Sequence, residues 1–224
     1  ETENRSVLHT ALRDFNLNSE IVKEIHSDRQ KIEKFTNDIL SGKTRGSTNK
    51  KITDIVNVGI GGSDLGPNMV VESLKFYKTD LNCHFVSNVD GDHLQEVLKL
   101  VDPETTVFII VSKTFTTQET LTNAKKIKEF LVSKSIEDIS KHFIGVTSNI
   151  KSAVEFGLDK NNIFKMYDFV GGRFSVWGSV GLCVSLAVGY ENFEKFLSGA
   201  NKMDEHFKVS NFEKNIPVCL ALIS

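Results

Sequence analysis

Residues 106–120 read T-V-F-I-I-V-S-K-T-F-T-T-Q-E-T. The first six, residues 106–111, are all β-branched or aromatic, which is typical of a strand. Residues 118–132 follow with the length and pattern of a helix. A strand that leads through a short polar loop into a helix indicates a β-α unit, the building block of a parallel sheet.

The same order of strand and helix recurs along the chain. Strand character is found in five runs, at residues 52–58, 81–86, 106–111, 142–146 and 162–166. Candidate helices separate them at residues 65–75, 92–100, 118–132 and 150–156. This alternation predicts an α/β fold, a three-layer αβα, doubly wound domain whose five-stranded parallel sheet is covered on both faces. Ligands of such folds bind beyond the carboxyl ends of the strands, so we expect functional loops after Val58 and Val111.

Helical segments flank this predicted domain. Residues 19–40 and 191–208 each show an amphipathic pattern with many charges. Residues 41–51 are polar and read as a solvated linker, whereas residues 171–189 are rich in small side chains and do not fit a sixth strand. We therefore expect an N-terminal helical extension at 1–45, the α/β domain at 46–190, and the start of a truncated helical region at 191–224.

Composition limits the classes of function. The 224 residues are 40% hydrophobic and carry a formal net charge of -2, so no field over the whole chain would recruit nucleic acid or an acidic membrane. The three cysteines are too few and too scattered for a disulfide framework, which favours the cytoplasm. No run reaches the roughly 20 apolar residues of a membrane span. The chain starts at Glu1 and stops in an apolar run at 218–224, from which we expect a fragment of a longer protein.

The loop after residue 111 concentrates polar groups at the start of a predicted helix. Four hydroxyls and one ammonium fall within six residues, from Ser112, Lys113, Thr114, Thr116 and Thr117. Because the N–H groups of the coming helix point the same way, the loop suits a phosphate monoester. A threonine-rich helix cap, with Glu119 in a capping box, is the alternative. Caps rarely need four hydroxyls and a lysine, so we favour the anion site.

A second loop, N-V-G-I-G-G-S-D-L-G-P at residues 57–67, follows the first predicted strand. Its glycines allow backbone N–H groups to approach an anion, with the Ser63 hydroxyl at the helix start. A tight turn that only packs is an equal alternative. A dinucleotide fingerprint needs glycine where Asp64 stands, and a nucleophile elbow needs glycine where Leu65 stands. Asp64 therefore argues against a dinucleotide-dependent dehydrogenase.

A third segment, F-V-G-G-R-F-S-V-W-G-S-V-G at residues 169–181, places Arg173 after a pair of glycines. A permanent cation held there could stabilise negative charge that develops on a ligand. A structural arginine paired with a carboxylate such as Asp168 is an equally good interpretation. The six histidines are dispersed without an H-x-x-x-H pair, so the sequence gives no support for a metal site, and no cofactor is expected.

Together the three segments resemble the glucose-6-phosphate isomerase family in their order, their spacing and the identity of their residues. Residues 2–13, T-E-N-R-S-V-L-H-T-A-L-R, resemble it too. The resemblance implies the first sugar-isomerase (SIS) domain, with a SIS-like, flavodoxin-like sheet, of a longer enzyme. It also implies a cytoplasmic homodimer that interconverts glucose 6-phosphate and fructose 6-phosphate in glycolysis and gluconeogenesis, without a cofactor or metal.

The resemblance assigns roles residue by residue. The groups that hold the phosphate or lie close to it are Ser112, Lys113, Thr114, Thr117, Ser63 and Gly62. Arg173, beside Gly172, stabilises the cis-enediolate that forms as a proton moves between C1 and C2 of the sugar. The family's glutamate base and its ring-opening histidine and lysine have no counterpart before Ser224, so we expect this chain alone to be inactive. A non-catalytic sugar-phosphate-binding SIS module is the alternative.

Overall fold

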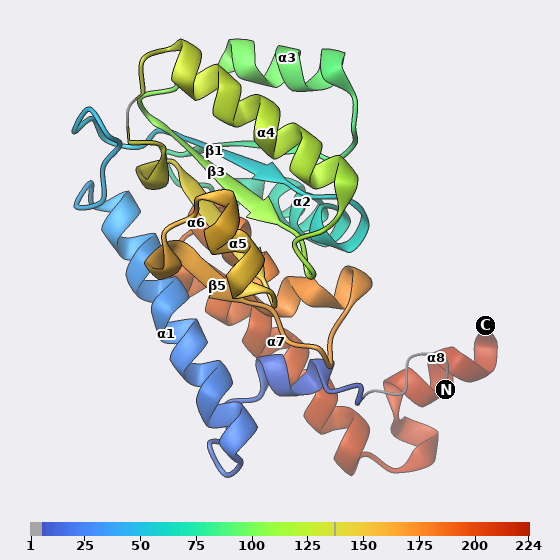
Figure 1. Ribbon diagram of the computed structural model, residues 1–224. Helices are drawn as coiled ribbons and strands as arrows, with labels where there is room; N and C mark the ends of the chain where they lie inside the picture. Colours follow the sequence, from blue (N-terminus) through green and yellow to red (C-terminus); the bar gives the residue numbers. More distant parts are fainter. Residues whose placement is uncertain (1–5, 137) are drawn as a thin grey trace.

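The computed structural model describes residues 6–136 and 138–224, so residues 2–5 of the N-terminal segment singled out above lie outside the described residues. Five parallel strands form one sheet in the order β2-β1-β3-β4-β5. The strands are β1 (Asp54–Val58), β2 (Asn82–Val86), β3 (Thr106–Val111), β4 (Phe143–Thr147) and β5 (Ile163–Lys165). Helices cover both faces of the sheet (Figure 1), which confirms the predicted doubly wound fold. The strand order is the flavodoxin-like one.

Alternate side chains of the central strands enter two separate cores. Val56 of β1 and Phe108 of β3 are fully buried among residues of α3 (Gly91–Leu100), α4 (Gln118–Ser133) and α5 (Ile150–Phe156). Ile55 and Ile109 point to the opposite face. The helices on that face are α1 (Glu20–Leu40), α2 (Leu65–Ser73), α6 (Leu182–Val188) and α7 (Tyr190–Val209). Both faces of β1 and β3 are thus closed to solvent, as a parallel sheet requires.

The fourth strand starts one residue later than predicted because His142 ends the 3-10 helix η4 (Ile139–Lys141), with its backbone in the αR region and its N–H donating to the Ile139 carbonyl. The His142 side chain makes two hydrogen bonds of its own. Its Nδ1–H donates to the Thr106 carbonyl over 2.8 Å, since a carbonyl can only accept, and its Nε2 accepts from the Ser47 N–H over 3.0 Å. His142 is completely buried. The predicted linker at residues 41–51 is exposed over most of its length, but this contact fixes it to the sheet. The predicted linker is thus solvated over most of its length and attached to the sheet at Ser47.

The small-residue segment after β5 forms short helices. Two 3-10 helices, η6 (Gly172–Trp177) and η7 (Ser179–Gly181), lead into α6, and within the described residues this segment adds no strand, as predicted. Close packing explains the small side chains, because a Cβ at Gly181 would lie 2.4 Å from the Val176 carbonyl oxygen. The segment 171–177 also lies directly against the loop that follows β1.

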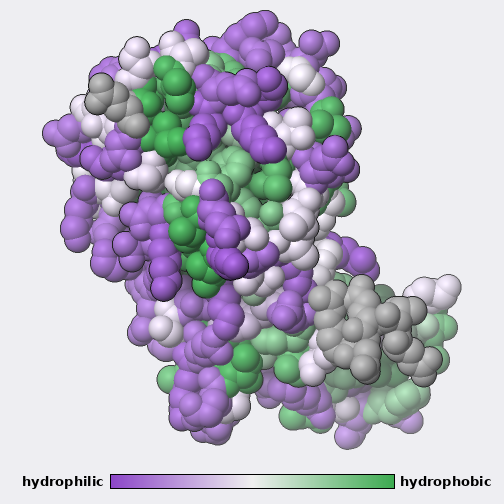
Figure 2. All heavy atoms as spheres, viewed as in Figure 1, coloured by the Kyte–Doolittle hydropathy of each residue, from purple (hydrophilic) through white to green (hydrophobic). Residues whose placement is uncertain are grey.

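The C-terminal helix α8 (Ile216–Ile223) extends from the end of α7 (Figure 1). It exposes apolar side chains, including Leu222 and Ile223, and Figure 2 shows hydrophobic residues at the lower right of the molecule. In residues 6–136 and 138–224, no helix has both the length and the apolar character to cross a membrane.

Candidate functional site

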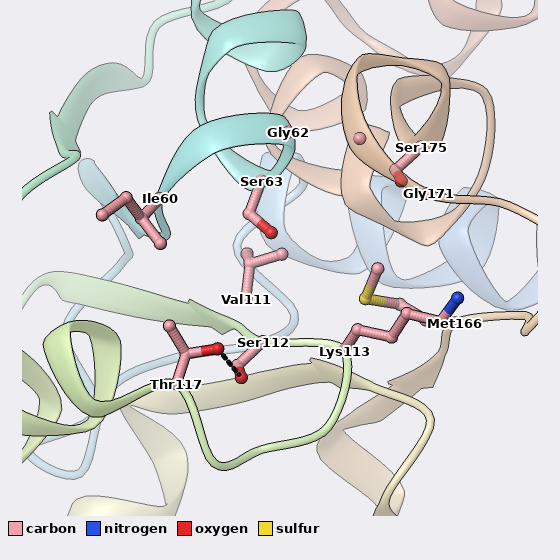
Figure 3. Close-up of a pocket in the computed structure, with 11 residues that line it drawn as sticks. Ile60, Gly62, Ser63, Val111, Ser112, Lys113, Thr117, Met166, Gly171 and Ser175 are labelled. Carbon is pink, nitrogen blue, oxygen red and sulfur yellow. Dashed lines mark hydrogen bonds between the residues drawn. The ribbon is translucent and has the colours of Figure 1, made fainter. Parts of the chain in front are cut away.

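A cavity of about 190 Å³ opens at the carboxyl ends of β1 and β3. These strands are neighbours, yet β1 continues into α2 on one face and β3 into α4 on the other, so their loops diverge and leave a crevice between them. All three predicted segments line the cavity (Figure 3). The lining residues are Ile60, Gly62, Ser63, Val111, Ser112, Lys113, Thr117, Met166, Gly171, Gly172 and Ser175.

Helix α4 begins at this cavity without a side-chain cap. Thr117 is its N-cap residue, but the Thr117 hydroxyl caps no N–H group of the first turn. Thr117 Oγ1 instead lies 2.9 Å from Ser112 Oγ (Figure 3). The first N–H groups of an α-helix have no partner within the helix. The threonine cap, which was the alternative interpretation, is therefore not formed, and the start of this 16-residue helix can accept an anion.

Lys113 connects the loop after β3 to the third segment. Its ammonium donates to the Asp168 carbonyl over 3.0 Å and to the Val170 carbonyl over 2.8 Å, and it lies 3.9 Å from the Asp168 carboxylate. The Lys113 side chain is 20% exposed. Figure 3 shows it reaching past Met166, on the side of the cavity away from Thr117. Lys113 thus lines the cavity while its charged end holds main-chain carbonyl groups.

Arg173 and Thr114 do not line the cavity. The Arg173 guanidinium lies 5.0 Å from the centre of the Phe174 ring, and the side chain is exposed. No carboxylate of the described residues forms an ion pair with it, so the alternative in which Asp168 pairs with Arg173 is not realised. The exposed Thr114 hydroxyl lies 2.6 Å from that of Thr116.

The first and third segments meet through glycine backbone. A Cβ at Gly62 would lie 2.2 Å from the carbonyl carbon of Gly172 and 2.5 Å from its Cα. Gly172 has φ of +54°, in the left-handed region that favours glycine. Gly62 therefore has a packing role as well as lining the cavity, because its missing side chain allows the segment that carries Arg173 to approach.

Two acceptor oxygens are buried beneath the loop that follows β1. Asn57 Nδ2 donates to the Ser63 carbonyl over 3.0 Å, but Asn57 Oδ1 and Asp64 Oδ1 find no partner in the described part of the chain. Asp64 is only 5% exposed, and burial raises the pKa of its carboxyl, an effect that nearby His93 opposes. The sequence marked Asp64 only as a missing glycine, although an acidic residue inside a glycine-rich loop is itself an unusual signal.

The cavity has the chemistry of a site for an oxyanion. The hydroxyls of Ser63, Ser112 and Thr117 can donate hydrogen bonds, and the start of α4 adds N–H groups and a positive dipole end. Lys113 adds a positive charge at the rim. Among residues 6–136 and 138–224, no cluster of three histidine, cysteine, aspartate or glutamate side chains could hold a metal ion.

Comparisons with known proteins agree with each other. The family model for phosphoglucose isomerase matches residues 1–224. Among curated proteins, glucose-6-phosphate isomerases from Christiangramia forsetii and from Buchnera aphidicola subsp. Schizaphis graminum are 58% and 52% identical to this chain, and each alignment covers 100% of this chain but 42% of the relative. The chain therefore spans less than half the length of these relatives.

Two solved structures extend the likeness to the fold. The crystal structure of a glucose-6-phosphate isomerase from Chlamydia trachomatis matches 97% of this chain and 42% of its own, with a TM-score of 0.83 and 32% identity. A hypothetical protein from Thermus thermophilus matches 99% of this chain and 48% of its own, with a TM-score of 0.73 and 26% identity.

Proposed function

This chain belongs to the phosphoglucose isomerase family, and from that premise we propose that it forms the phosphate-binding part of an enzyme that interconverts glucose 6-phosphate and fructose 6-phosphate. The observation that carries the proposal is the uncapped start of α4, where the Thr117 hydroxyl is paired with Ser112 inside the cavity. We propose the predicted limits for this part as well, with the SIS domain at 46–190 between helical regions at 1–45 and 191–224.

The phosphate oxygens would accept hydrogen bonds from the α4 N–H groups and from the hydroxyls that face the cavity. Ser112 and Thr117 come from the loop that leads into α4, and Ser63 comes from the opposite side, next to Gly62. Thr114 would join them by turning away from Thr116. Hydrogen bonds to an ionised phosphate are shorter and stronger than those to a neutral acceptor. A dianionic phosphate would thus anchor the sugar with its reacting end pointing out of the cavity.

Arg173 would serve that reacting end. Its guanidinium is exposed, forms no ion pair within the described residues, and follows directly on Gly172 of the cavity wall. As a proton moves between C1 and C2 of the open-chain sugar, negative charge develops on the cis-enediolate, and a fixed cation lowers the energy of that species. The reaction shifts a proton and an electron pair within one molecule, so it needs no external redox partner.

The remaining groups would come from outside this sequence. We propose that the glutamate base and the ring-opening histidine and lysine lie in further segments of a cytoplasmic homodimer that acts in glycolysis and gluconeogenesis. Neither nucleic acid nor membrane is a partner in this proposal. The chain alone would bind sugar phosphate without converting it.

Isothermal titration of this chain with fructose 6-phosphate tests the proposal, with fructose and inorganic phosphate as separate controls and an isomerase assay alongside. We expect binding that requires the phosphate group, and no turnover. A chain that is folded by circular dichroism but binds none of the phosphates, or binds fructose equally well, would contradict the phosphate site. Turnover by the chain alone would contradict the assignment of the base to another segment.

A further inference from the structure

The charged end of Lys113 serves the third segment rather than the centre of the cavity. An ammonium has three donors, and two of them go to the carbonyl oxygens of Asp168 and Val170 at 3.0 and 2.8 Å. Both carbonyls belong to the backbone that leads directly into Gly171, Gly172 and Arg173. Lys113 itself sits between Ser112 and Thr114, so one side chain joins the loop of the phosphate site to the segment that carries Arg173.

Other contacts hold the same segment from different sides. The Leu8 N–H donates to the Phe169 carbonyl over 3.2 Å, and the His9 ring lies 4.7 Å from the Phe174 ring. The Gly62 backbone packs directly against Gly172. Lys113 is the contact among these that comes from the loop leading into α4. The Arg173 side chain is exposed, and its guanidinium lies over the ring of its neighbour Phe174, so the backbone of the segment determines where Arg173 lies.

We propose that Lys113 is a positioning residue, which sets the place of Arg173 by holding the carbonyl groups of residues 168 and 170. The meaning of this role for catalysis rests on the function proposed above, whereas the contact itself does not. If Lys113 instead bound the phosphate directly, its ammonium would have to leave both carbonyl oxygens and cross the cavity toward Thr117. The positioning role therefore predicts that loss of the Lys113 ammonium loosens residues 168–173, whereas a phosphate-binding role predicts that these residues stay as they are.

Limited digestion with an arginine-specific protease measures how firmly residues 168–173 are held. Cleavage after the exposed Arg173 reports loosening of the segment, and cleavage after Arg45, in the exposed turn at residues 41–51, is an internal reference for loosening of the whole chain. The test variant is Lys113→Met, which keeps the length of the side chain and removes its donors. Lys113→Arg restores donors and adds a cleavage site after residue 113, whose fragments are counted separately from the two cuts that are compared. Lys151→Met removes the same charge from an 87% exposed side chain.

We expect Lys113→Met to be cut after Arg173 about tenfold faster relative to Arg45, because two hydrogen bonds to a charged donor are lost. Lys113→Arg should return to within about twofold of the unmodified chain, and Lys151→Met should match it. An unchanged ratio in Lys113→Met, or an equal rise at Arg45, overturns the proposal. If Lys113→Met does not fold, Lys113→Gln, whose side chain is shorter, takes its place. Its ratio of cleavage after Arg173 to cleavage after Arg45 is compared with that of Lys113→Arg, and equal ratios overturn the positioning role.

Titration with inorganic phosphate separates this proposal from the proposed function. A direct phosphate ligand would show a large loss of phosphate affinity in Lys113→Met with an unchanged cleavage ratio, which overturns the positioning role. A faster cut after Arg173, in a chain whose unmodified form binds no phosphate, contradicts the proposed function and supports the positioning contact.

Discussion

Replacing Gly62 by alanine tests whether the loop after β1 and the segment that carries Arg173 touch through backbone. The added Cβ would lie 2.2 Å from the Gly172 carbonyl carbon and 2.3 Å from its oxygen. Carbon atoms in good contact stand about 3.5–4.0 Å apart, so the methyl is short of a normal contact by more than about 1 Å. Since the opposing atoms are backbone, no change of rotamer relieves the clash, and one segment must move.

That movement sets the expected magnitude. Insertion of a methyl group into a packed site costs about 1–3 kcal/mol, which outweighs the 0.4–1 kcal/mol or so that alanine gains by restricting the unfolded chain. A shift of about 1 Å at Gly172 also moves Arg173, and in a complete enzyme a misplacement of that size costs on the order of 100-fold in rate. Phosphate affinity falls too, because Gly62 and Gly172 both line the cavity.

Urea unfolding followed by tryptophan fluorescence measures the effect. Trp177 is the only tryptophan of the chain and ends the same 3-10 helix that Gly172 begins, so its signal reports the perturbed segment. Gly199→Ala is the matched control, because Gly199 lies inside α7 and an added Cβ there meets no atom within 4 Å. Alanine in a helix interior should raise the free energy of unfolding by about 0.5–1 kcal/mol. The same substitution thus has opposite signs at the two positions.

The reasoning is refuted if Gly62→Ala unfolds at the same urea concentration as the unmodified chain and keeps its affinity for inorganic phosphate. A loss of stability without any change in phosphate affinity would refute only the link between this contact and the cavity.

Two further predictions concern the cavity and the acid beneath it. Thr117→Val should weaken phosphate binding about tenfold in titration calorimetry, because one hydroxyl donor is lost, whereas Thr116→Val, outside the cavity, should change it less than about twofold; equal effects would contradict the site. Burial raises the pKa of Asp64 in the folded state, so this group's contribution to the free energy of unfolding rises as pH falls below neutral through that pKa. Asp64→Asn should therefore be more stable than the unmodified chain at pH 7. If the difference between their free energies of unfolding does not narrow on acidification, the expected direction of the pH dependence is wrong.

The strands and helices could be predicted because each is short, regular and bounded by polar or glycine-containing loops. Residues 106–111 and 150–156 were predicted with the bounds that the structure shows. One departure occurs at the fourth strand. The strand predicted from residue 142 begins at Phe143, because the His142 backbone still closes the short 3-10 helix η4, and a helix of three residues is too short to show a periodicity in the sequence.

The site was only partly accessible to the same reasoning. Residue types and spacing located the hydroxyls of Ser112 and Thr117, but spacing cannot show that these two groups bond to each other and leave α4 uncapped. Met166 lines the cavity without any distinguishing sequence signal, and Ser175 lies in the third segment but was not itself singled out. The contact of Gly62 with the third segment was missed for a related reason, since a glycine in the sequence can indicate close packing but not which segment packs against it.

The cavity also has a consequence for the order in which the chain folds. Strand β1 can pair with β2 early, but its other neighbour, β3, is complete only at Val111, and the cavity wall at residues 171–175 lies further along still. A nascent chain that has joined β1, β2 and β3 already possesses the hydroxyls of Ser112 and Thr117, but it lacks the opposing wall. Because a ligand stabilises only the state that binds it, phosphate would favour the finished domain over any partly assembled one. Phosphate binding during refolding would then mark the point at which residues 171–175 join the cavity.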